Sequence, residues 1–148
     1  MAPFYRHTQI GTAIIVIFAV TLLPLAAVTI LVEPHPCYIA VLASLVLVGV
    51  LFATLTVTID AGTLSWHFTF GFLNKSLALS DIAGATPVSN KWWWGLGIRA
   101  TPRGWLYNVS GLGAVEITRG DGSTIRIGTD EPVRLTAAIR AAIDKTPS

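Results

Sequence analysis

The stretch Lys91-Trp92-Trp93-Trp94 places a cation beside three consecutive indole rings, and Arg99 follows five residues later. Tryptophan favours the boundary between a membrane and water, because its ring is apolar while its N–H needs a polar partner. Basic side chains close by can contact anionic headgroups. These residue types predict a membrane-interface or partner contact at Lys91, Trp92, Trp93, Trp94 and Arg99. Two other interpretations stay open: packing of at least one ring, most simply Trp94, into the fold, and contact with a protein partner.

A second basic feature is spread over the strands expected near the end of the chain. Its members are Arg99, Arg103, Arg119 and Arg126. If these strands are adjacent, the four guanidinium groups form one basic face. The default interpretation is a solvated surface, and the alternative is contact with anionic lipid or an acidic partner.

The sequence gives no support for a metal site, a disulfide, a dinucleotide site or a catalytic site. His7, His35 and His67 lie in separate regions and predict no metal site. The single Cys37 forms neither an intramolecular disulfide nor a metal cluster. The Gly95-Leu96-Gly97 segment does not continue into a dinucleotide-binding fingerprint. With no nucleophile–base pair or paired carboxylates evident, we expect no catalysis, no cofactor and no metal.

The composition divides the chain into an apolar part and a part that is typical of a soluble domain. Hydrophobic residues make up 53% and charged residues 12%, whereas a soluble domain usually carries about 25% charged residues. Between residues 8 and 58 the ionisable side chains are Glu33, His35, Cys37 and Tyr38. From Asp60 onward the composition is typical of a soluble domain. The net charge of +2 is too small and too dispersed to indicate nucleic-acid binding.

The apolar part contains two runs, residues 10–32 and residues 37–53, joined by a link at residues 33–36. A helix over the first run would be about 34 Å long, enough for a hydrocarbon core of about 30 Å. The second run is at the short end of the spanning range. Two prolines in the link end the first helix, so we predict a two-helix transmembrane hairpin. A cleaved signal peptide is the competing interpretation, but its apolar region is usually only about 7–15 residues long.

The flanking charges predict an orientation. Arg6 precedes the first run, and the link contains neither Lys nor Arg. The positive-inside rule then places both termini in the cytoplasm of a two-pass plasma (inner) membrane protein, with residues 1–9 as a cytoplasmic tail. In the second run, Gly49 and Ala53 have the spacing of small residues that let helices approach. They predict close packing within the hairpin, with dimerisation through the same face left open.

Alternating polar and apolar residues begin at Thr54 and predict about seven antiparallel strands. The expected strands are residues 54–60, 63–70, 76–82, 97–101, 105–108, 113–118 and 123–127, with a loop at residues 83–94. A final helix is expected after Thr129 or Asp130 as its cap, with Glu131 and Pro132 in its first turn. Its apolar stripe consists of Leu135, Ala138, Ile139, Ala142 and Ile143.

Four segments carry a resemblance to a known family. They are Trp94-Gly95-Leu96-Gly97-Ile98-Arg99, Ser110-Gly111-Leu112-Gly113, the hairpin at residues 114–127, and Ile127-Gly128-Thr129-Asp130-Glu131-Pro132. In this order they resemble the bacterial pleckstrin-homology-like (PH-like) domains carried on membrane hairpins, over residues 54–145. The resemblance implies a strongly bent seven-stranded sheet closed by a helix, with a binding or assembly role and no reaction. Phosphoinositide-binding members carry basic residues at the first turn, which is here Asp60-Ala61-Gly62, so this specificity is not expected.

The combined prediction is a membrane α-helical hairpin followed by a mainly-β PH-like domain at residues 54–148. It would act as an interaction or assembly module at the cytoplasmic face of the membrane. Its expected partners are the lipid bilayer, a membrane or cytoplasmic protein, and a second copy of itself. The alternative is an accessory subunit of a membrane transport or envelope-maintenance complex that acts through the hairpin. A charged residue in a span would favour that alternative, but the spans hold nothing more polar than threonines and Ser44.

Overall fold

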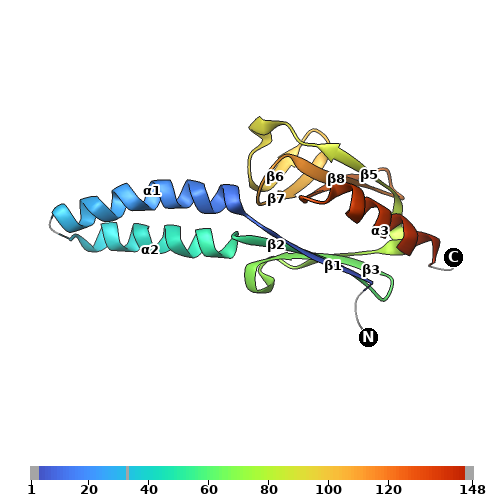
Figure 1. Ribbon diagram of the computed structural model, residues 1–148, viewed down its shortest axis with the longest axis horizontal. Helices are drawn as coiled ribbons and strands as arrows, with labels where there is room; N and C mark the ends of the chain where they lie inside the picture. The colour runs from blue at the N-terminus through green and yellow to red at the C-terminus, as the bar shows by residue number, and fades with distance from the viewer. Residues whose placement is uncertain (1–3, 33, 146–148) are drawn as a thin grey trace.

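The computed structural model describes residues 4–32 and 34–145, and it has an elongated shape. Two helices, α1 (Thr12–Leu31) and α2 (Pro36–Leu51), lie side by side and project from one end of a β-rich domain (Figure 1). The domain contains two sheets and a carboxy-terminal helix, α3 (Pro132–Asp144). An apolar amino-terminal helix joined to a mainly-β domain with a final helix is therefore confirmed.

The first sheet has the strand order β1-β2-β3-β4 and is antiparallel throughout. Its strands are β1 (Tyr5–Ile10), β2 (Thr54–Asp60), β3 (Thr63–Phe68) and β4 (Lys75–Ala78). The second sheet has the order β5-β8-β9-β7-β6. Its strands are β5 (Ile82–Ser89), β6 (Gly97–Thr101), β7 (Gly104–Asn108), β8 (Gly113–Arg119) and β9 (Thr124–Gly128). Three short 3₁₀ segments connect them, namely η1 (Thr69–Gly71), η2 (Leu79–Asp81) and η3 (Trp92–Trp94).

The core lies between the two sheets and under α3. On β3 the alternation buries Leu64, Trp66 and Phe68, as the pattern of that strand predicts. Helix α3 packs on β5 and β8, with Leu135 and Ile139 fully buried. The predicted stripe is thus confirmed as the face that joins α3 to the sheets. The helix begins with Glu131 at its cap position and Pro132 in its first turn, but no side chain caps it.

The prediction that residues 1–9 form a tail outside the domain is wrong for the residues described. Tyr5 to Ile10 form β1, which pairs with β2 in unbroken register from Tyr5↔Ile59 to Ile10↔Thr54. Tyr5 and Gln9 are the residues that β1 buries. Because one of the two is polar, the segment lacks the apolar alternation that marks a strand. Residues 1–3 lie outside the described residues.

The strand prediction is also corrected between residues 69 and 94. The expected loop at residues 83–94 contains most of β5, and the described residues form nine strands rather than about seven. Gly84 and Pro87 argue against a strand in sequence, but β5 lies at a sheet edge, where proline is tolerated. The expected strand at residues 76–82 is divided between β4 and η2, and β7 pairs with β9 in parallel. The two sheets are therefore not the all-antiparallel arrangement predicted.

The helices differ from the two predicted spans in length. Of the described helices, only α1 is long and apolar enough to cross a membrane, with a mean hydropathy of 2.8 over 18 residues. Helix α2 has 16 residues, or about 24 Å of helix against a hydrocarbon core of about 30 Å. Length and composition therefore do not support two complete spans. The link residue Glu33 lies outside the described residues.

At the junction, the paired strands continue directly into the paired helices (Figure 1). The Gly11 N–H donates to the Ala53 carbonyl at 2.7 Å, which closes the ladder just before the helices begin. The β7–β8 turn braces this point through Ser110, whose hydroxyl accepts from the Ala13 N–H at 3.3 Å and whose carbonyl accepts from Gln9 Nε2 at 3.0 Å. The base of α1 is therefore tied to both sheets.

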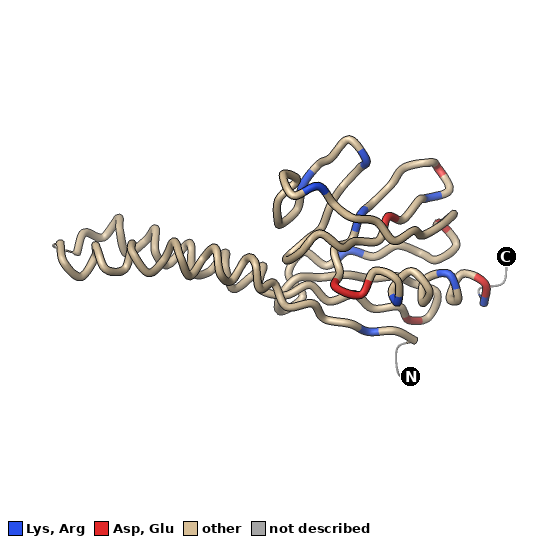
Figure 2. The backbone as a smooth tube through the Cα atoms, turned by 45° about the horizontal axis from the view of Figure 1, so that its top comes forward, with Lys and Arg blue, Asp and Glu red and all other residues tan. Residues whose placement is uncertain are grey.

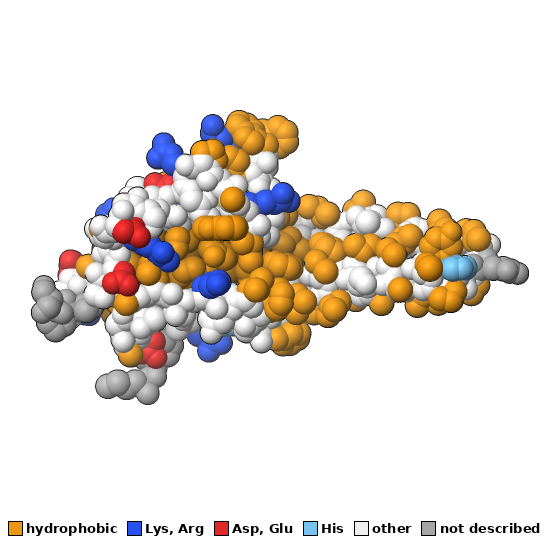
Figure 3. All heavy atoms as spheres, turned by 180° about the vertical axis from the view of Figure 1, so that it is seen from behind, with side chains coloured by type: hydrophobic (Ala, Val, Ile, Leu, Met, Phe, Trp, Pro, Cys, Tyr) orange, Lys and Arg blue, Asp and Glu red, His pale blue; other side chains and the backbone are white. Residues whose placement is uncertain are grey.

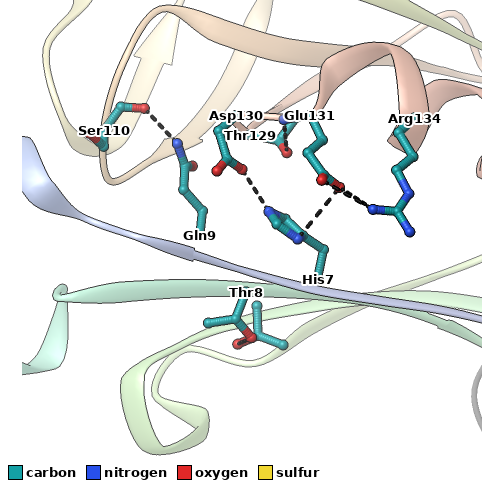
Figure 4. Close-up of polar contacts among 9 residues, drawn as sticks. His7, Thr8, Gln9, Ser110, Thr129, Asp130, Glu131 and Arg134 are labelled. Atoms are coloured by element: carbon teal, nitrogen blue, oxygen red, sulfur yellow. Dashed lines mark hydrogen bonds and ion pairs between the residues drawn. The ribbon is translucent and has the colours of Figure 1, made fainter.

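A polar cluster ties the other end of β1 to the start of α3 (Figure 4). His7 Nε2 lies 2.6 Å from Asp130 Oδ1, and His7 Nδ1 lies 3.5 Å from Glu131 Oε2. Glu131 also accepts from Arg134 at 3.1 Å. Residues more than 120 positions apart in sequence thus hold the amino-terminal strand on the domain.

Gly11 provides a test of the junction. A Cβ at this position would lie 2.9 Å from the Ala53 carbonyl oxygen and 3.1 Å from Val109 Cβ. We expect Gly11→Ala to lower the free energy of unfolding by roughly 1–3 kcal/mol, the usual cost of overpacking, measured by urea unfolding in detergent micelles. The matched control is Gly84→Ala, since nothing lies within 4 Å of the added carbon. Equal losses in both variants would contradict this account of the junction.

Candidate functional site

The helical pair exposes an apolar surface unlike that of the domain. Only 6% of the most apolar 18-residue stretch of α1 is buried, and α2 has no buried residue. Apolar side chains cover the pair along its length in Figure 3, and Leu23, Ile30 and Leu31 are each more than 70% exposed. Soluble proteins rarely leave apolar patches larger than a few hundred Å² open to water. This surface therefore needs lipid or protein around it, and α1 is not the core helix of a soluble fold.

Trp92 and Trp93 lie at the base of this helical pair. Trp92 is 76% exposed and Trp93 61%, and their rings meet edge to face at 5.7 Å. Trp92 lines an apolar groove of about 620 Å³ together with Ile14 and Phe18 of α1. Lys91 Nζ lies 5.1 Å from the centre of the Trp93 ring. The structure thus places the Trp92 ring beside the first turns of α1, with the Trp93 ring in contact with it.

Trp94 belongs to the domain and not to this exposed pair. It is half-buried, and the Arg126 guanidinium lies 4.8 Å from the centre of its ring. Arg126 is itself buried, with Nη2 2.7 Å from Glu116 Oε2 and Nη1 3.2 Å from Asn90 Oδ1. The η3 segment is therefore pinned by its third tryptophan, which leaves the first two to project.

Arg99 lies at the same groove as Trp92. Its Nε donates to the Leu96 carbonyl at 3.2 Å, and its guanidinium lies beside Gly95. The four arginines do not share one face: Arg99 is at the helix base, Arg126 is buried in an ion pair, and Arg103 and Arg119 line a separate cleft.

A second apolar loop lies at the base of the helices, and the sequence did not predict it. Phe70 is 89% exposed with φ +57°, and Leu73 is 40% exposed with φ +50°. Between them Phe72 packs edge to face on Phe52, which follows α2, with ring centres 5.7 Å apart. Bulky residues rarely adopt positive φ, so this turn holds an apolar side chain outward at a conformational cost. The Gly71-Phe72-Leu73-Asn74 run, a turn signal, was the available clue.

The fold brings together no metal-binding cluster among the described side chains. Across residues 4–32 and 34–145, no group of three or more His, Cys, Asp and Glu side chains is placed to hold a metal ion. His67 Nδ1 bonds to the adjacent Phe68 carbonyl oxygen at 2.8 Å. Cys37 is exposed at the start of α2, at the end of the helical pair far from the domain.

Comparisons with protein families, curated proteins and solved structures find no match to this chain. Function is therefore inferred from the geometry at the helix base and from the surfaces of the domain.

The ion pair behind Trp94 is expected to be a major support of the η3 segment. Arg126→Ala leaves the Glu116 carboxylate, only 16% exposed, without its partner. We expect it to lower the free energy of unfolding by roughly 3 kcal/mol, measured by urea unfolding. Arg134→Ala, which removes an exposed ion pair, should cost less than about 1 kcal/mol. Adding Glu116→Gln to Arg126→Ala should recover part of the loss, and no recovery would argue against an unpaired carboxylate as its cause.

Proposed function

We propose that the chain is a membrane-anchored interaction module without catalysis, with its β-rich, PH-like domain held against the cytoplasmic face of the plasma (inner) membrane. The helical pair is the anchor, and the tips of η1 and η3 rest at the bilayer surface. The observation that carries this proposal is the projection of Trp92, Trp93 and Phe70 at the end of the domain from which the helices emerge.

The packing of α2 supports a shared membrane environment for both helices. A Cβ on Gly49 would lie 2.9 Å from Phe18 Cδ1, so the backbone of α2 approaches α1 closely at this point. Short helices enter bilayers by local thinning or by anchoring their flanking residues at the interface. The pair would then make two passes, with α1 as the full-length span and both termini on one side.

Charge supports the cytoplasmic placement. Lys and Arg lie on the domain and on β1, and none lies on the described residues of the two helices (Figure 2). The positive-inside rule favours the side that carries the basic residues. The absence of charged side chains from α1 and α2 also favours an anchor over an ion or proton pathway.

The strand before α1 argues against a cleaved signal sequence. Removal of the chain up to about residue 27 would take β1 out of its sheet and expose the edge of β2. It would also remove the buried Tyr5 and Gln9. A segment that completes the mature fold in this way is expected to be retained.

The depth of the tryptophans tests the interfacial placement. In liposomes of the full chain, we expect quenchers attached near the lipid headgroups to quench the emission of Trp92 and Trp93. The variant Trp92→Phe/Trp93→Phe should lose most of this quenching, because the two exposed rings are removed. Trp105→Phe is the control, since this ring is 54% exposed but lies on β7 away from the groove. Equal quenching in the two variants would argue against contact at η3.

The single cysteine tests the topology. Cys37 is exposed at the far end of the helical pair, so a membrane-impermeant maleimide added outside spheroplasts should label it. In a Cys37→Ser background, Ser80→Cys on the exposed surface of the domain should be labelled only after lysis. The reverse pattern would invert the proposed orientation, and labelling of both sites from outside would argue against a membrane-separated arrangement.

A further inference from the structure

A second cleft opens between the two sheets on the domain, apart from the groove at the helix base. It has a volume of about 650 Å³ and lies against β3, β4, β7 and the turns β6–β7 and β8–β9. Its apolar wall consists of Trp66, Trp105, Tyr107 and Ile125. Figure 3 views the molecule from behind, where an apolar area on the domain is bordered by Lys and Arg side chains and, toward the end away from the helices, by Asp and Glu side chains.

Three cations converge on this cleft from distant parts of the sequence. They are Lys75 at the start of β4, Arg103 in the β6–β7 turn and Arg119 at the end of β8, and no acidic residue is among the lining residues. None of the three forms a salt bridge with another described residue. Asp121, the nearest acid to Arg119 in the β8–β9 turn, accepts hydrogen bonds from Ser123 and lines a neighbouring depression. Arg119 also lines that depression, beside Asp81 and Asp121, but neither acid lines the cleft itself. Like charges gathered in one cleft repel one another, so the cleft favours an anion.

Two residues that line the cleft carry a buried donor with no acceptor among the described residues. Trp66 is only 2% exposed, and its Nε1 has no hydrogen-bond partner among the described residues. The Nε of Arg119 is also buried without a partner among them. Buried donors are normally paired, and both of these residues line the cleft. The Tyr107 ring packs edge to face on Trp66, with the ring centres 5.4 Å apart. Burial raises the pKa of Tyr107, so its hydroxyl keeps its proton at neutral pH.

The turn that carries Arg103 is held in place before any ligand binds. The Thr101 hydroxyl donates to the Gly104 carbonyl at 2.8 Å and accepts from the Arg103 N–H at 3.2 Å. The Thr124 hydroxyl donates to the Arg103 carbonyl. Gly104 has φ +103°, and a Cβ there would collide with the Thr124 backbone. The β6–β7 and β8–β9 turns are therefore locked together, which fixes two walls of the cleft.

We propose that this cleft binds a phosphate group carried on a flat or apolar body. Lys75, Arg103 and Arg119 match the double negative charge of a phosphomonoester, and the aromatic wall accommodates the group that carries it. A volume of about 650 Å³ falls within the range of small-molecule sites, roughly 300–1,000 Å³. The phosphate belongs either to a free metabolite or to a lipid headgroup, and the inference stands apart from the membrane contact proposed at η3.

The test uses the full chain with its five tryptophans replaced by 5-fluorotryptophan. Each labelled residue is expected to give its own ¹⁹F resonance. Resonances are assigned with single Trp→Phe variants. In zwitterionic micelles, phenyl phosphate is titrated to about 20 mM. This concentration approaches saturation of a weak site with a Kd of roughly 10⁻³ M. We expect saturable shifts of Trp66 and Trp105, with Trp92 and Trp93 unmoved. A parallel arm compares phosphatidylcholine nanodiscs with and without phosphatidic acid, and a Trp66 shift confined to phosphatidic acid identifies a headgroup as the source.

Charge variants decide whether the cations bind the phosphate. Arg119→Gln and Lys75→Gln should each weaken the apparent affinity roughly tenfold, the effect of losing one charge-assisted hydrogen bond. Arg134→Gln removes the same charge from the exposed surface of α3 and should leave the affinity unchanged. Lys75 is exposed, so its variant keeps the test valid if Arg119→Gln disturbs the fold. The proposal is overturned if neither probe moves Trp66, or if Arg134→Gln weakens binding as much as Lys75→Gln.

Discussion

The rest of the structure depends on one constraint, the passage from a strand pair to a helix pair at Gly11 and Ala53. Paired strands lie about 4.8 Å apart, whereas packed helices need about 8–10 Å between their axes. The chains must therefore separate within one or two residues, immediately after the 2.7 Å bond from the Gly11 N–H to the Ala53 carbonyl. Glycine permits this approach because any larger residue would press on Ala53 and Val109. Two covalent connections, rather than one, then fix how the domain sits on the helices.

That fixed placement gives the exposed aromatic residues a physical explanation. Phe70, Trp92 and Trp93 belong to two loops that are distant in sequence, yet both loops lie where the helices leave the domain. Exposing large apolar side chains to water is unfavourable by about 25 cal/mol for each Å², and Phe70 adds the cost of a positive φ. An environment that is partly apolar at this level removes the first of these costs. The proposed bilayer surface is such an environment, since the helices beside it are apolar along their length.

The elements that the sequence predicts well are those with local periodicity. The alternation at Thr54–Asp60 and the apolar stripe of α3 each need only neighbouring residues to be recognised, and both are confirmed. β1 was missed because its inward residues include Gln9, whose role depends on a carbonyl 101 residues away. Phe70 continues the alternation of β3 in sequence, but the chain leaves the strand at Phe68. Arg126 lies directly across from Glu116 only because of the β8–β9 register, so its burial could not be inferred from a list of arginines.

The cleft on the domain follows from the one pairing that local sequence could not indicate. β7 joins the second sheet in parallel beside β9 instead of beside its chain neighbour β8. This crossover brings the β6–β7 turn against the β8–β9 turn at Thr124, so Arg103 and Arg119 line one cleft although sixteen positions separate them. In a simple meander, β8 would lie between β7 and β9 and hold the two turns apart. The approach of Arg103 and Arg119 in one cleft is therefore a property of the topology, and it places the proposed phosphate site on the domain rather than on the helical pair.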